Sequence, residues 1–422
     1  MVHLMQLLLR VMKNVIWFKE LSKKDTALVG GKGANLGELM RAGFPVPPGF
    51  VITAEAFQAA METAGLRGGL LERFRAVDPD DAQGLAAASK ELMAKVRSAP
   101  LPKALRSELS EAYRALGDKA RVAVRSSATS EDQPDTSFAG MHETFTNVAG
   151  DEQLFARVSD CWASLFGQRV IAYRRSRQMT EEPRIAVVVQ KMVGSARAGV
   201  IFTADPSSSD RRHVVIEAAF GLGEVVVSGQ VEPDTYVIDR AGPKVLSARV
   251  GEKAFKIIRG SDGRDARLEL SADEGKRRVL SDAEVLELAR LALKVEQHYG
   301  APQDLEWAEE AGRFYLVQTR PITTLEQTPG AAAPAEPLVV GLAASPGLGP
   351  GKVRVIGSPA DQGQMQNGEV LVAPMTSPDW VPAMRRASGI VTDSGGMTCH
   401  AAIVSRELHI PCVVGTHTAT QV

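Results

Sequence analysis

A segment rich in Pro and Ala, without hydrophobic periodicity, interrupts the chain at Gln327–Pro337. Such a composition is typical of an extended, semi-rigid linker and not of a helix or a strand. The chain has 422 residues, which at roughly 100–200 residues per domain allows two to four domains. We therefore expect a large domain before the linker and a smaller one after it.

Composition excludes several classes of function. The 49 Lys and Arg residues balance 50 Asp and Glu residues, so no overall field would recruit nucleic acid or an anionic membrane. The apolar start, Met1–Arg10, is shorter than the roughly 20 residues that cross a bilayer. We interpret residues 1–11 as an extension without function. The cysteines are three, widely spaced and without a CxxC motif, which argues against disulfides and zinc and favours the cytoplasm.

Helical and strand patterns alternate along the large domain, which predicts an α/β (α+β) fold. Residues 54–117 are rich in helix formers, and helical spacing returns between Asp282 and Tyr299. The β-branched run at 185–190 is typical of a strand that is buried on both faces. Further strands are predicted at 50–53, 122–125, 198–203, 213–217, 234–238 and 313–318. After the linker, strands at 351–356, 370–374 and 387–392 precede a helix at 398–407.

Two segments of the large domain have the chemistry of phosphate binding. Gly30–Asn35 opens a helix, where backbone N–H groups favour an anion and Lys32 adds a positive charge. A helix start with a solvated lysine explains the same pattern equally well. Arg125 ends a predicted strand and is followed by a Ser-rich stretch, 126–136. We interpret Arg125 as a phosphate ligand and most of the serines as a surface loop.

A third cluster lies near the end of the large domain. On two neighbouring antiparallel strands, Glu306 and Gln318 would face the same side, beside Arg320. Their oxygens suit Mg²⁺, which accepts few protein ligands and keeps several waters. Taken alone, the segment is better explained as an amphipathic hairpin with exposed polar residues.

The strongest signal is His400, which follows a Gly-Gly turn at the start of a helix of small residues. A helix N-terminus stabilises a phosphoryl group on the ring, and Ala401 and Ala402 leave room for it. Arg406, two helical turns further on, also favours a functional histidine. Cys399 is adjacent, but neighbouring helical side chains diverge, so a Cys–His dyad is the weaker hypothesis.

Together these residues resemble the phosphoenolpyruvate synthase (pyruvate, water dikinase) family, within the wider group that includes pyruvate phosphate dikinase. The match runs through segments 29–38, 43–50, 124–128, 217–224, 318–321 and 395–402. The resemblance implies an ATP-grasp nucleotide-binding domain at 12–325, a linker at 326–337 and a swivelling phosphohistidine β/α domain at 338–422. We expect the latter domain to be incomplete.

The resemblance also implies roles for single residues. Lys32 and Arg125 would contact the ATP phosphates, and Gln190 and Glu217 would lie by the adenine and ribose. Glu306 and Gln318 would bind Mg²⁺, with Arg320 beside the transferring phosphate. His400 would take the phosphoryl group and carry it to pyruvate, so that ATP, pyruvate and water give AMP, phosphoenolpyruvate and phosphate.

One departure from the family concerns length. Family members continue into a large (β/α)₈ barrel that binds pyruvate and phosphoenolpyruvate, and we expect this chain to lack it. A pyruvate phosphate dikinase and a rifamycin phosphotransferase remain alternatives, although the drug-binding domain expected between the two domains in the latter is missing. A non-catalytic ATP-binding fragment is an alternative of another class. A homodimer is among the assemblies that we consider.

Overall fold

The computed structural model describes residues 13–78, 81–129, 143–176, 179, 181–206, 210–260, 263–322 and 337–422. The expected N-terminal extension and all of the linker except Pro337 lie outside these residues. The chain forms two compact units that divide between Met192 and Val193. This division falls inside the large domain predicted from the sequence. Within the described residues, no helix has the length and apolar character that crossing a membrane requires.

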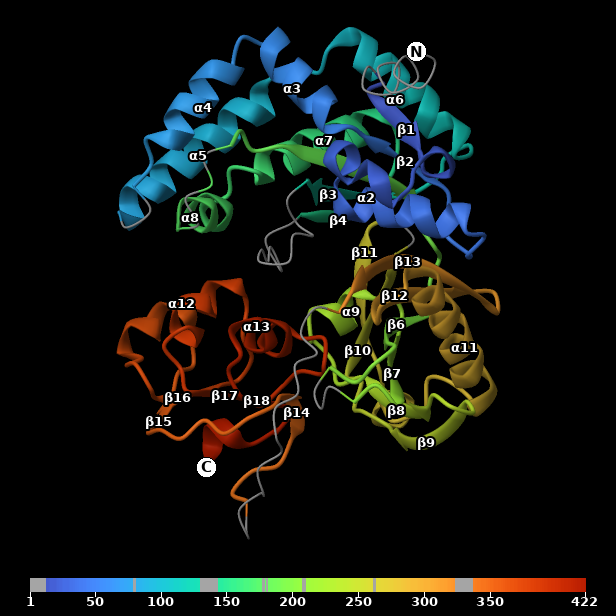
Figure 1. The fold of residues 1–422 in the computed structure, drawn as a ribbon, viewed down its shortest axis with the longest axis vertical. Helices are drawn as coiled ribbons and strands as arrows, with labels where there is room; N and C mark the ends of the chain where they lie inside the picture. Colours follow the sequence, from blue (N-terminus) through green and yellow to red (C-terminus); the bar gives the residue numbers. More distant parts are fainter. Residues whose placement is uncertain are drawn as a thin grey trace. The chain divides into compact units, whose positions relative to one another are not determined.

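The first unit is built on a five-stranded antiparallel sheet (Figure 1). Its order is β1 (Val15–Trp17), β2 (Gly49–Ile52), β5 (Ile185–Lys191), β3 (Val122–Ala128) and β4 (Thr144–Val148). Strand β5 lies at the centre and is buried along nearly its whole length, as its β-branched sequence predicts. It pairs with β2 on one side and β3 on the other.

Helices cover both faces of this sheet. The helices are α2 (Thr26–Arg41), α3 (Ala54–Thr63), α4 (Arg67–Arg75), α5 (Ala82–Ser98), α6 (Lys103–Ala115), α7 (Asp151–Ser164) and α8 (Gln168–Ser176). On one face, alternate residues such as Val124 and Val187 form a single core with Phe57, Leu109 and Trp162 of the helices. The other face is covered by α2, where a Cβ on Gly33 would come within 3.0 Å of Val51.

Strand β3 corrects one interpretation made from the sequence. It continues through Ala128, so Ser126 and Ser127 are fully buried strand residues and not part of a surface loop. Their hydroxyls have backbone partners: Ser126 Oγ accepts from the Glu143 N–H at 3.0 Å, and Ser127 Oγ donates to a carbonyl of α2. The rest of the predicted loop, from residue 130, lies outside the described residues.

The second unit contains a six-stranded antiparallel sheet. Its order is β13 (Arg313–Pro321), β12 (Gln303–Glu310), β6 (Arg197–Phe202), β7 (His213–Phe220), β8 (Asp234–Asp239) and β9 (Lys244–Arg249). Helix α11 (Asp282–Tyr299) packs against this sheet (Figure 1). The remaining elements here are α9 (Glu224–Val227), α10 (Ala272–Gly275) and the hairpin β10 (Phe255–Arg259) with β11 (Asp265–Glu269).

The second unit also contains a five-stranded sheet near the C-terminus. Its order is β14 (Leu342–Ser345), β18 (Cys412–Val414), β17 (Gly389–Thr392), β16 (Val370–Ala373) and β15 (Val353–Val355). All neighbours are parallel except β14 and β18. The helices are α12 (Val381–Met384) and α13 (His400–Leu408). Short 3-10 helices of the chain lie at Phe18–Glu20, Lys23–Asp25, Pro359–Gln364, Pro378–Trp380 and Ala419–Gln421.

Candidate active site

The glycine-rich segment is a break inside α2. Gly30 has φ 69° and ψ 169°, which interrupts the helix, and Lys32 follows in the first turn after the break. A Cβ on Gly30 would lie 2.2 Å from Ser127 Oγ and 2.4 Å from the Ser127 carbonyl oxygen. Both the backbone conformation and the close approach therefore require glycine at this position.

Ser127 fixes this segment to β3. Its hydroxyl donates to the Val29 carbonyl at 2.9 Å and accepts from the Gly33 N–H at 3.3 Å. The hydroxyl thus takes up a donor and an acceptor on either side of the break. Sequence reasoning missed this residue, although its position two residues after Arg125 places both side chains on one face of the strand.

Arg125 and Gln190 lie on the sheet face that α2 covers. In the ladder between β3 and β5, Arg125 pairs with Val188 and Ala123 pairs with Gln190, so these four residues point to the same side. Gln190 is 2% exposed, and within the described part of the chain its amide nitrogen has no hydrogen-bond partner. A buried donor without an acceptor is costly, so this nitrogen fits a ligand acceptor.

The second unit gathers four polar side chains on the hairpin of β12 and β13. Glu306 is directly opposite Gln318, and Asp304 is opposite Arg320, so all four share one face. Arg320 Nε donates to Asp304 Oδ2 at 2.7 Å. The predicted juxtaposition of Glu306 and Gln318 is confirmed, and their role as ligands stays a prediction. Asp304 was missed, although its spacing from Glu306 puts it on the same strand face.

The donor chemistry of this hairpin fits Mg²⁺. A carboxylate and an amide oxygen face each other across one pair of the ladder, and hard oxygen ligands of this kind suit that ion. Among the described residues, no group of three or more His, Cys, Asp or Glu side chains could hold a metal. A site with two protein ligands, completed by phosphate and water, matches this arrangement.

Glu217 lies on the same face of the six-stranded sheet. Val200 of β6 pairs with Glu217 on one side and with Glu306 on the other. Two strand spacings separate the two carboxylates' backbones, about 10 Å. Glu217 is fully buried, and burial raises the pKa of its carboxyl. In this structure it accepts bonds from Met397 and Thr398, and its predicted role at the ribose stays a prediction.

His400 is the first residue of α13, two residues later than the predicted start of that helix. Its Nδ1 lies 2.9 Å from the hydroxyl oxygen of Thr376, a buried residue that follows β16. The hydroxyl thus fixes the orientation of the ring through Nδ1. Thr376 is 24 residues away in the chain, and no local pattern marks it.

Two other residues near His400 in the chain, Arg406 and Cys399, are buried. Arg406 is 7% exposed and donates to the carbonyls of Met397, at 2.7 Å, and Ala344, at 3.0 Å. It therefore holds the backbone before His400. Cys399 is buried, and burial raises the pKa of its thiol to about 11. The thiol stays neutral near pH 7, which agrees with the preference for His400 as the nucleophile.

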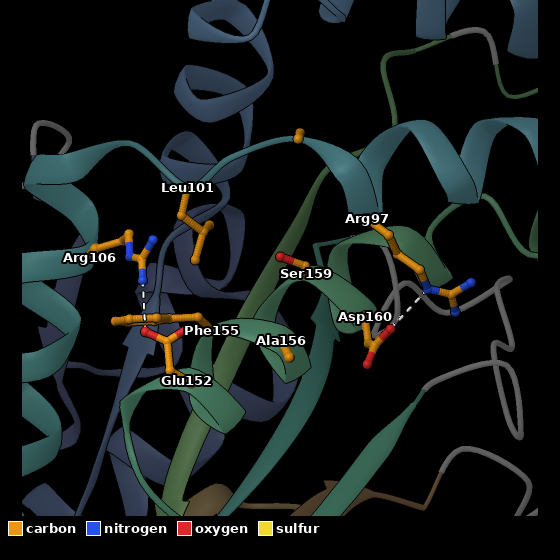
Figure 2. Close-up of a pocket in the computed structure, with 9 residues that line it drawn as sticks. Arg97, Leu101, Arg106, Glu152, Phe155, Ala156, Ser159 and Asp160 are labelled. Atoms are coloured by element: carbon orange, nitrogen blue, oxygen red, sulfur yellow. Dashed lines mark hydrogen bonds and ion pairs between the residues drawn. The ribbon is translucent and has the colours of Figure 1, made fainter.

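A hollow of about 340 Å³ in the first unit is separate from these residues (Figure 2). Figure 2 shows that Arg97 is bonded to Asp160 and Arg106 to Glu152. The N···O distances of these bonds are 2.9 Å and 2.8 Å. Among the described residues that line it, none is a predicted site residue. Since its arginines are already paired with carboxylates, we assign it no role.

These features define a nucleotide-binding domain followed by a small domain that presents a histidine. Residues 26–337 match the family described as pyruvate phosphate dikinase, AMP/ATP-binding domain, and residues 365–422 match the PEP-utilising enzyme, mobile domain. The chain belongs to the first of these families. The expected fold class, with the ATP-binding domain first and the mobile domain second, is confirmed.

Curated relatives share a name. The chain is 48% identical over 420 residues to the probable phosphoenolpyruvate synthase of Archaeoglobus fulgidus, which covers 97% of this chain and 56% of the relative. It is 48% identical over 423 residues to the probable phosphoenolpyruvate synthase of Methanothermobacter thermautotrophicus, which covers 98% of this chain and 61% of the relative. It is 41% identical over 457 residues to the phosphoenolpyruvate synthase of Pyrococcus furiosus, covering 96% and 56%. The chain thus spans little more than half the length of these relatives.

Proposed function

We propose that the chain transfers a phosphoryl group from ATP to His400, as the donor part of a phosphoenolpyruvate synthase. The overall reaction converts ATP, pyruvate and water to AMP, phosphoenolpyruvate and phosphate. The names of the relatives and the two family matches support this reading. Pyruvate and phosphoenolpyruvate would bind to a barrel domain outside residues 1–422.

One observation carries the proposal. The loop before His400 is hydrogen-bonded to Glu217, on the sheet face that also bears Glu306, Gln318 and Arg320. A phosphoryl acceptor is therefore held by the same face that would hold the metal and the phosphates.

The proposed roles follow from the two sets of residues. In the first unit, Lys32 and Arg125 bind phosphate oxygens, and the buried amide of Gln190 donates to the adenine. In the second unit, Arg320 neutralises charge on the transferring phosphate. Glu306 and Gln318 hold Mg²⁺, which supplies charge neutralisation at the phosphates when bound.

The chemistry assigned to this chain is positioning and proton control. Thr376 fixes the imidazole through Nδ1, so the lone pair on Nε2 can attack phosphorus. Because AMP is the nucleotide product, the attack falls on the β-phosphorus: the N–P bond forms as the bond from that phosphorus to the oxygen of the α-phosphate breaks, and AMP departs with this oxygen. Water then cleaves the terminal phosphoryl group from the group on His400 and releases it as phosphate, which leaves one phosphoryl group on the histidine. Fixed cations around the phosphates stabilise the transition state because charge there needs no solvent reorganisation.

The finer boundaries are part of the proposal: an ATP-grasp domain at 12–325, a linker at 326–337 and a phosphohistidine domain at 338–422. We also propose a cytoplasmic location, since all three cysteines are buried and free. We also propose that the chain forms a homodimer, which the molar mass from analytical ultracentrifugation would test.

The test is ATP binding by calorimetry with and without Mg²⁺. We expect the affinity for ATP to fall at least about tenfold on metal removal or in Glu306→Gln, because the phosphates lose a neutralising charge. Glu310→Gln, which alters the exposed end of the same strand, is the control. If the affinity for ATP changes neither on removal of Mg²⁺ nor in Glu306→Gln, the assignment of the metal site is contradicted.

A further inference from the structure

The peptide unit of Met397 is held between the side chains of two buried residues, Glu217 and Arg406. Its N–H donates to Glu217 at 2.7 Å, and its carbonyl accepts from Arg406 at 2.7 Å. Glu217 is 0% exposed and Arg406 is 7% exposed. Both ends of this peptide unit are therefore fixed by buried side chains, three residues before His400.

Thr398 adds a third bond to the same carboxylate. Its hydroxyl donates to Glu217 Oε2 at 2.8 Å, while Met397 bonds Oε1. Both carboxylate oxygens of a residue on β7 are thus engaged by the loop before α13.

Close backbone contacts are independent evidence that the loop before His400 packs tightly against the residues around Glu217. A Cβ on Gly396 would lie 2.9 Å from Glu217 Oε1 and 3.1 Å from Pro233 Cγ. On the opposing segment, a Cβ on Gly229 would lie 2.6 Å from Cys399 Cβ. The loop can approach Glu217 and the segment of Gly229 this closely only because neither Gly396 nor Gly229 has a side chain.

The contact between this loop and Glu217 lies near the predicted metal ligands. Glu217 and Glu306 belong to one row across the sheet, two strands apart, which is about 10 Å. His400 follows Thr398 by two residues, so their Cα atoms are at most about 7 Å apart. A loop bound to Glu217 therefore keeps His400 near the face that carries Glu306 and Gln318.

We propose that Glu217 is a positioning residue that docks the His400 loop, through Met397 and Thr398, in the pose in which His400 accepts the phosphoryl group. The role rests on the proposed function and differs from the nucleotide contact that the family resemblance implies. Glu217 exchanges neither a proton nor an electron pair with the reacting atoms. Its effect is on the rate of transfer at saturating ATP and not on the affinity for ATP.

The experiment uses the full chain and measures two quantities for each variant: the rate constant of His400 phosphorylation at saturating MgATP, and the dissociation constant of ATP. Glu217→Gln, Thr398→Val and Gly396→Ala are expected to lower the rate about ten- to hundredfold. The dissociation constant should stay within about twofold of the wild-type value. Thr398→Ser keeps the hydroxyl and should restore the rate.

Glu309→Gln is the matched control, because it removes the charge of another buried carboxylate on this sheet, one that bonds Arg197 at 3.0 Å. Its phosphorylation rate should stay within about twofold of wild type. Circular dichroism verifies that each variant is folded.

Two results would overturn the proposal: an unchanged rate in Glu217→Gln or Gly396→Ala, or a loss in Glu217→Gln that higher ATP fully restores. The second result would favour the nucleotide contact instead. If wild-type protein forms no phosphohistidine, the proposed function fails, and docking is then judged by hydrogen exchange of the Met397 amide. Exchange must be slow in wild type and at least about tenfold faster in Glu217→Gln and Thr398→Val; equal exchange refutes the docking.

Discussion

At the scale of single residues, the site depends on side chains that hold other groups in place. Ser127 holds the backbone on both sides of Gly30, Thr376 holds the ring of His400, and Arg406 holds the carbonyl of Met397. Each is buried. Burial protects these hydrogen bonds from water, so each contributes more to geometry than an exposed bond would.

Thr376 gives the residue-scale prediction. Thr376→Val keeps the shape of the side chain but removes the hydroxyl 2.9 Å from Nδ1. We expect the rate of His400 phosphorylation to fall about tenfold, because the ring loses the bond that sets its orientation and tautomer. The rate constant of phosphohistidine formation under single-turnover conditions measures this effect.

Thr376→Ser is the control, since it retains the hydroxyl and should react at close to the wild-type rate. A Thr376→Val protein as fast as wild type would show that the hydroxyl does not orient the ring for transfer.

At the scale of elements, local sequence patterns predicted most strands and helices, and contacts between distant segments produced the rest. The buried strand β5 and helix α11 follow from apolar patterns within a few residues. The extension of β3 through Ala128 depends on its ladder with β5, in which Ser127 pairs with Ala186. The loop before α13 is bonded to Glu217, which is 181 residues from Thr398. No pattern in a short window contains such partners.

The same distinction applies to the candidate site. The alternation of residues on two strands correctly predicts that Glu306 and Gln318 face each other. The bond between Thr376 and His400 and the bond between Met397 and Glu217 could be seen only in the folded structure. The identities of candidate ligands were thus accessible from the sequence, and the residues that position them largely were not.

The break in α2 gives the element-scale prediction. Gly30→Ala places a Cβ within 2.4 Å of the Ser127 carbonyl oxygen at φ 69°. We expect the free energy of unfolding of the first unit to fall by about 3 kcal/mol, from backbone strain and overpacking together. Denaturant-dependent hydrogen exchange of the β3 amides measures it.

Gly43→Ala is the matched control, because Gly43 also has a positive φ, 82°, but among the residues that the structure describes none beyond its chain neighbours comes within 4 Å of the added Cβ. Strain alone should cost about 1 kcal/mol there. Equal losses in the two variants would contradict the contact between the glycine segment and Ser127.

At the scale of the whole molecule, the candidate residues are divided between the two compact units. Lys32, Arg125 and Gln190 belong to the first, and Glu306, Gln318, Glu217 and His400 belong to the second. Neither set alone contains both the nucleotide ligands and the phosphoryl acceptor, so the account requires the intact chain.

The central claim is that His400 receives a phosphoryl group from ATP, and peptide-level mass spectrometry after incubation with MgATP tests it most directly. The account predicts an addition of about 80 Da, one phosphoryl group, on the peptide that contains His400. The adduct should be labile in acid and absent from His400→Asn protein. An unlabelled wild-type chain, or equal labelling in His400→Asn, would contradict the account.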